Sequence, residues 1–233
     1  MKLAHPGGEA RNWLKFREVM CLARAGREPT LTWTALCIRL FPAMRTRLPD
    51  TFTYRQALAL GLSKRRLYEL RDTGEIELVS RGLYRRCDAA PVDEDLLELA
   101  TRSEWATLCL GTALSLHSLS DDIPASRDVA IPRGTRPPTT RARVQWHTFN
   151  PATFNIGREL VSVNQRVKIG RYNAERSIVD AFRLRGREGH ELGNEALRRW
   201  LRRPGAHPSA LLEMASEFPR ALTPLRQALE VLL

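Results

Sequence analysis

The chain of 233 residues has only four cysteines and no spacing that would hold a metal or a disulfide framework. Cys21, Cys37, Cys87 and Cys109 are scattered, with neither a C-x-x-C pair nor a paired histidine spacing beside them. This usage argues against structural zinc and against a disulfide scaffold, and it fits a reducing compartment. We therefore expect a cytoplasmic protein that holds no metal and no cofactor.

Long apolar runs are also absent. A transmembrane helix needs about eighteen or more consecutive apolar residues, and the sequence contains no such stretch. The most apolar run, residues 31–41, is interrupted by Thr32, Thr34 and Arg39. It also begins too far from the N-terminus for a secretory signal. We expect no membrane segment.

Positive charge is in excess. The net charge is +11 and the isoelectric point is near 10.3, which favours a polyanionic partner such as nucleic acid. Residues 1–50 hold nine Lys/Arg against four Asp/Glu, and residues 51–88 hold eight against five. The remaining residues are nearly balanced, with twenty against seventeen. The positive excess is therefore concentrated towards the N-terminal end.

Residues 53–71 have the pattern of a helix, a glycine turn and a second helix rich in arginine. A DNA-binding helix-turn-helix needs a small residue in its first helix, so that the second helix can cross close by. It also needs a glycine at the turn and a branched apolar residue in the second helix. Ala57, Gly61 and Leu67 supply these in the required order. Gln56 follows the expected N-cap residue, Thr53, by three positions, which allows a capping box.

The second helix of this motif has a basic face. At 100° per residue, Leu67 and Leu70 fall on one side, whereas Arg65 and Tyr68 point away from them. A positive, hydrogen-bonding face on a helix anchored by leucines suits the major groove, although an ordinary solvated face is the alternative. The expected DNA contacts on this helix are Ser63, which can also cap it, Lys64, Arg65, Tyr68 and Arg71.

A short hairpin follows the second helix. Gly74 ends the helix, and residues 75–79 alternate as a strand does. A turn at residues 80–82 leads to a returning strand at 83–86. Arg81 at the tip, with Arg85 and Arg86 behind it, is expected to contact the phosphate backbone or the minor groove. Residues 50–88 therefore predict a winged helix-turn-helix.

The remaining chain predicts an α+β fold with a helical C-terminus. We expect an N-terminal extension at 1–49, the winged domain at 50–88, a linker at 89–91 and a mixed α/β domain at 91–233. The expected helices are 93–102, 105–119, 174–185, 195–201, 209–217 and 219–232. The expected strands are 128–131, 144–149, 158–164 and 165–169.

Taken together, these segments resemble the AbiEi family, the antitoxins of type IV toxin–antitoxin systems, in their actinobacterial form. The resemblance rests on QALALGLS at 56–63, GEIELVSRGLY at 74–84, GTALSLHSL at 111–119, IPRG at 131–134 and AERSIVDAFRL at 174–184. It implies an autorepressor that binds inverted repeats in its operator through the winged domain. It also implies that the C-terminal domain counteracts a nucleotidyltransferase-like toxin, directly or indirectly. Residues 1–43 fall outside the resemblance.

The C-terminal domain shows no readable catalytic motif. Ser115 and His117 point about 200° apart on a helix, so they do not form a nucleophile–base pair. Arg176 and Asp180 have the spacing of a helix salt bridge. The glycines at 186–193 lack the Lys-Ser/Thr ending of a P-loop, and no protein-kinase signature occurs.

We therefore expect a binding protein and not an enzyme. Two alternatives stay open: an atypical kinase that phosphorylates the toxin, and a ligand-responsive transcription factor. The candidate residues for the antitoxin function, carried over from the resemblance or weighed above, are Ser115, His117, Arg133, Arg176 and Asp180.

Overall fold

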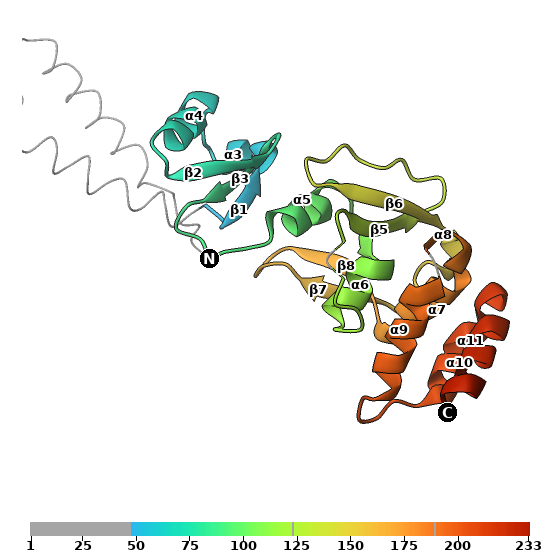
Figure 1. Ribbon diagram of the computed structural model, residues 1–233. Coiled ribbons are helices and arrows are strands. Elements are labelled where there is room, and N and C mark those ends of the chain that lie inside the picture. Colours follow the sequence, from blue (N-terminus) through green and yellow to red (C-terminus); the bar gives the residue numbers. More distant parts are fainter. Residues whose placement is uncertain (1–47, 123, 189) are drawn as a thin grey trace, which may run out of the picture.

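The computed structural model describes residues 48–233 apart from 123 and 189, so most of the expected N-terminal extension lies outside the described residues. The described chain is a mixed α+β structure with two sheets (Figure 1). The smaller sheet has the strand order β1-β3-β2, and the larger has the order β6-β5-β4-β8-β7. We call residues 48–88 the N-terminal unit and residues 91–233 the C-terminal unit.

The N-terminal unit places two helices before a hairpin. Its elements are β1 (Thr51–Thr53), α3 (Tyr54–Ala59), α4 (Lys64–Asp72), β2 (Ile76–Ser80) and β3 (Leu83–Arg86). The expected caps are confirmed, because Thr53 and Gln56 form a capping box on α3 and the Ser63 hydroxyl accepts from the backbone N–H of Arg66. Strand β1 was not expected: three residues carry no readable period, and antiparallel pairing with β3 defines the strand.

A small apolar core holds the two helices against the hairpin. Ala57 and Leu67 are fully buried, as the crossing of two closely spaced helices requires. Gly61 and Gly74 adopt φ values of 87° and 73°, which let the chain leave α3 and α4 without the strain that a side chain would meet. The rest of the core is Leu48, Phe52, Leu62, Leu70, Ile76 and Tyr84.

In the C-terminal unit, most helices gather beside one end of the five-stranded sheet, and α5 lies on the side of the N-terminal unit (Figure 1). Its strands are β4 (Thr107–Leu108), β5 (Arg127–Pro132), β6 (Val144–Phe149), β7 (Arg158–Ser162) and β8 (Lys168–Tyr172). Its helices are α5 (Glu94–Arg102), α6 (Leu110–Leu116), η1 (Pro151–Thr153), α7 (Ala174–Arg183), α8 (Arg185–Glu188), α9 (His190–Leu201), α10 (Pro208–Ser216) and α11 (Pro219–Leu232). The largest apolar cluster packs α6, α7, α9, α10 and α11 together.

The prediction of one helix from the sequence is partly wrong. The segment 105–119 is not a single helix, because Thr107–Leu108 forms β4, the central strand of the larger sheet. This strand has only two residues, yet it pairs with β5 on one side and β8 on the other. Such a short buried strand has the same apolar composition as the helix that follows it, so periodicity does not separate the two.

The glycines at 186–193 belong to helices where they are described, and not to a phosphate-binding loop. A β-carbon at Gly193 would lie 3.3 Å from the ring of Phe182, so this glycine permits α9 to approach α7 closely. The expected helix 195–201 accordingly begins earlier, at His190. The second of the two strands expected at 158–169 is displaced to Lys168–Tyr172, where it pairs with β7.

The two units touch along one side of the hairpin. Arg102 on α5 donates to the backbone oxygen of Arg81 at 2.9 Å, and Arg141 donates to the backbone oxygen of Val79 at 2.6 Å. Val79 and Leu83 of the hairpin also form an apolar cluster with Leu97 of α5. The chain between the units is therefore not their only connection, and α5 holds the tip of the hairpin in place.

Candidate nucleic-acid interface and the C-terminal site residues

The exposed face of α4 is built around Tyr68. The ring is 37% exposed, with Lys64 Nζ 5.7 Å and the Arg71 guanidinium carbon 4.9 Å from its centroid. These cation–π contacts follow from the helical spacing of i−4 and i+3 around the tyrosine. The side chain of Arg65 is 90% exposed beside this group. The face therefore offers one aromatic hydroxyl among three cations.

Carboxylates on the same helix orient these cations. Glu69 accepts from Arg65 Nε at 3.0 Å and from Arg66 Nη1 at 3.2 Å, and these two bonds lower the pKa of Glu69. Arg71 is held by Asp72 at 2.8 Å. Pairs as exposed as these contribute little to stability, so their effect is to limit where the guanidiniums point. A shallow hollow along this face is lined by Lys64, Arg65, Tyr68, Glu69 and Asp72.

The arginines of the hairpin differ in how far they are engaged. Arg81 is exposed at the turn between β2 and β3. Arg85 is largely covered and donates through Nε to Glu77 at 2.5 Å. Arg86 donates to Asp88 at 2.7 Å and to the backbone oxygen of Leu48 at 3.2 Å. To contact DNA, Arg85 would have to leave Glu77, and Arg86 would have to leave Asp88 and Leu48. Arg81 can contact DNA without breaking an ion pair of the described chain.

His117 is a structural residue at the end of α6. Its Nε2 lies 2.9 Å from the backbone oxygen of Tyr172, the last residue of β8. Since a carbonyl only accepts, Nε2 carries the proton and donates it. Burial lowers the pKa of His117, which keeps the ring neutral. His117 therefore ties the end of α6 to the last residue of β8. Ser115 is half-buried on the same helix.

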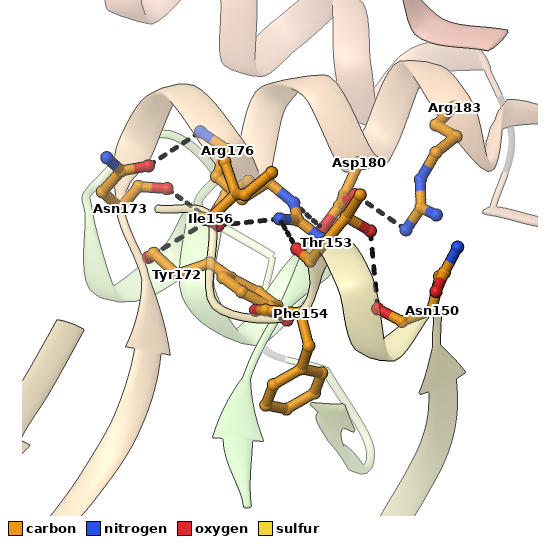
Figure 2. Close-up of polar contacts among 10 residues, drawn as sticks. Asn150, Thr153, Phe154, Ile156, Tyr172, Asn173, Arg176, Asp180 and Arg183 are labelled. Carbon is orange, nitrogen blue, oxygen red and sulfur yellow. Dashed lines mark hydrogen bonds and ion pairs between the residues drawn. The ribbon is translucent and has the colours of Figure 1, made fainter. Parts of the chain in front are cut away.

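The expected pair of Arg176 and Asp180 is confirmed, and it is fully buried. Arg176 Nε donates to Asp180 Oδ2 at 2.9 Å, and both side chains have 0% exposure. Arg176 Nη1 also donates to the backbone oxygens of Thr153 and Ile156, at 2.9 and 2.7 Å. Figure 2 shows the pair lying over the loop that joins β6 to β7. Arg176 therefore fixes this loop against α7.

A third charged residue, Arg183, joins this pair and was missed from the sequence. Its Nη2 lies 2.8 Å from Asp180 Oδ1, on the side away from Arg176 (Figure 2). The spacing from Asp180 is i+3, a signal that the sequence did contain. Burial raises the pKa of Asp180, and the two guanidiniums oppose that shift. Arg133, the remaining candidate, is exposed just after β5 and is not part of the buried pair.

Aromatic rings from three elements enclose the two arginines, and they too were not singled out from the sequence. The Arg176 guanidinium carbon lies 4.3 Å from the centroid of Tyr172 and 4.1 Å from that of Phe218. That of Arg183 lies 4.5 Å from the centroid of Phe149. Ring faces carry negative potential, so they offset part of the cost of burying these cations.

Metal sites and membrane-spanning helices were also sought in the described part of the chain. Within residues 48–233, leaving aside 123 and 189, no cluster of three or more His, Cys, Asp or Glu side chains has a metal-binding arrangement. No helix in this part of the chain is long and apolar enough to cross a membrane.

The N-terminal helices of this mixed α+β chain expose a basic, tyrosine-centred face of the kind that suits a nucleic-acid partner. The comparison with protein families agrees, because residues 45–86 match the family described as "Transcriptional regulator, AbiEi antitoxin". The match covers nearly the whole N-terminal unit and none of the C-terminal unit. No curated protein is significantly similar to the chain.

Proposed function

We propose that the N-terminal unit is a winged helix-turn-helix that binds inverted repeats in the operator of its own operon. Helix α4 enters the major groove, and the hairpin β2–β3 lies as the wing along the backbone or minor groove. The observation that carries this proposal is the exposed face of Lys64, Arg65, Tyr68 and Arg71, within a segment that matches the AbiEi regulator family. Arg81 at the wing tip extends the same surface.

We further propose that residues 91–233 form the antitoxin domain, which neutralises a nucleotidyltransferase-like toxin. The support is the family match of the preceding unit together with the resemblance of residues 111–119, 131–134 and 174–184 to AbiEi antitoxins. The buried pair of Arg176 and Asp180 then acts as a structural clamp of this domain. The contacts from Arg102 and Arg141 to the hairpin tie the antitoxin domain to the wing.

The first expected result concerns reading of the bases. Replacing Arg65 by alanine should weaken operator binding by about 10- to 100-fold and relax the base preference, because a bidentate contact from arginine to guanine is lost. Gel shifts on the upstream region at several salt concentrations measure both effects. An Arg65→Ala variant that binds the operator as tightly as the original chain would show that α4 is not the recognition helix.

Three arginine variants of the hairpin separate base reading from backbone contact. Arg81→Ala should weaken binding to all sequences alike and lower the slope of log affinity against log salt by about one. Arg85→Ala and Arg86→Ala should weaken binding less than Arg81→Ala, because both side chains are already paired with carboxylates. A larger effect at Arg86 than at Arg81 would place the phosphate contacts on the strand and not on the tip.

The second expected result concerns mechanism. With His117 bound to Tyr172 and Asp180 bound to Arg176, we expect neutralisation by contact with the toxin or through a shared target, and not by covalent modification. Purified toxin is incubated with this protein, Mg²⁺ and ATP, and its intact mass is then measured. A protein-dependent gain of one phosphoryl group would make the antitoxin domain an atypical kinase. An unchanged mass with co-elution would support direct contact, and without co-elution it would support a shared target.

A further inference from the structure

A hollow of about 390 Å³ lies at one end of the larger sheet, and none of the residues of the proposed DNA-binding surface lines it. Strands β5 and β6 are parallel, and they end at Pro132 and Phe149, immediately before two residues that line the hollow, Arg133 and Asn150. The carboxyl ends of parallel strands are where ligands commonly bind in open sheets. Other residues lining the hollow are Thr153, Arg183, Glu217, Phe218, Pro219 and Arg220.

The charges around this hollow do not balance. Arg176, Arg183 and Asp180 form one cluster, in which a single carboxylate faces two guanidiniums. Arg133 and Arg220 add two exposed guanidiniums, and Glu217 adds one carboxylate. No ion pair involving Glu217 is found in the described part of the chain. Two positive charges are therefore in excess among the exposed residues of the hollow and the buried cluster behind Arg183.

Arg183, which lines the hollow, and Arg176, which contacts the lining residues Thr153 and Phe218, carry buried hydrogen-bond donors without acceptors. Arg183 Nε and Nη2 and Arg176 Nη2 have no hydrogen-bond partner among the described residues. The 2.8 Å contact of Arg183 with Asp180 is thus a close ion pair that lacks hydrogen-bond alignment. The side chain of Arg183 is 18% exposed and reaches the wall of the hollow. A partly buried guanidinium with unused donors is a costly group unless an anion completes its surroundings.

We propose that this hollow binds a small phosphomonoester, whose phosphate is held by Arg133, Arg183 and Arg220. A phosphomonoester carries about two negative charges at neutral pH, which matches the excess. Guanidiniums bind phosphate oxygens through paired hydrogen bonds, and Asn150 and Thr153 supply further polar groups. The volume lies in the range of about 300–1,000 Å³ that is usual for small-ligand sites. This site goes beyond the proposed function, because neither operator binding nor toxin neutralisation requires a small ligand.

Calorimetric titration of the full-length protein tests the proposal. The probes are inorganic phosphate and glycerol 2-phosphate, with acetate at equal ionic strength as the control anion. We expect both phosphates to bind and acetate not to bind. Arg220→Ala and Arg133→Ala should each weaken phosphate binding by about tenfold or more, since a charge-assisted hydrogen bond is lost. Both residues are exposed, so these variants retain the fold.

Arg226→Ala is the matched control, because Arg226 is exposed on the same helix and does not line the hollow. If Arg220→Ala and Arg226→Ala weaken phosphate binding equally, the affinity comes from the overall positive charge and not from a site, and the proposal is overturned. Phosphate binding that is lost in Arg65→Ala but kept in Arg220→Ala would place the phosphate on α4 and also overturn it. If phosphate fails to bind while Arg220→Ala abolishes neutralisation of the toxin, the hollow instead receives an acidic protein surface. None of these outcomes depends on whether the operator is bound.

Discussion

Replacing Asp180 by alanine is expected to lower the free energy of unfolding of the C-terminal unit by about 3–5 kcal/mol. Asp180 is fully buried and is the carboxylate that faces both Arg176 and Arg183. Its removal leaves the guanidiniums of Arg176 and Arg183 beside aromatic rings without their shared carboxylate. Urea denaturation followed by circular dichroism measures the loss. Asp180→Asn should destabilise less than alanine, because the amide oxygen can still accept one hydrogen bond.

The control for this prediction is Asp121→Ala. Asp121 also pairs with an arginine, Arg199, at 2.6 Å, but its side chain is 84% exposed. Exposed ion pairs contribute little, so the denaturation midpoint should hardly move. If Asp180→Ala were no more destabilising than Asp121→Ala, the buried cluster would not hold α7 against the loop that follows β6.

Replacing Leu67 by alanine is expected to destabilise the N-terminal unit by about 2–5 kcal/mol and to abolish operator binding. Leu67 is fully buried on the inner face of α4, so its loss leaves a cavity beneath the proposed recognition helix. The core of this unit contains few residues, and a loss of that size is a large part of its stability. Gel shifts and denaturation monitored by tyrosine fluorescence measure the two effects.

Leu58→Ala serves as the matched control, since Leu58 is 43% exposed on the neighbouring helix α3. It should leave both the fold and operator binding nearly unchanged.

The Leu67→Ala variant also tests the proposed division of work between the units. We expect it to protect cells from the toxin while failing to bind the operator. Loss of protection despite a folded C-terminal unit would show that neutralisation needs the wing, which Arg102 and Arg141 connect to the antitoxin domain.

Local sequence determined most of the N-terminal unit. The caps at Thr53 and Ser63, the turn glycines and the leucine stripe on α4 all act within a few residues of each other. Interactions of this range leave a readable period and recognisable end signals, and the helices and hairpin lie where these signals place them. The pair of Arg176 and Asp180 was readable for the same reason, because one helix sets its spacing.

Tertiary structure alone decided the features that join distant segments. Strand β4 exists because β5 and β8 pair with its two residues, and no local signal distinguishes it from the helix that follows. The same holds for the enclosure of Arg183 by Phe149 and Phe218, which lie on different elements. The hollow beside the larger sheet likewise brings together Arg133 and Arg220 from distant parts of the chain. Charge balance at such a place depends on packing, and packing between distant segments leaves no period in the sequence.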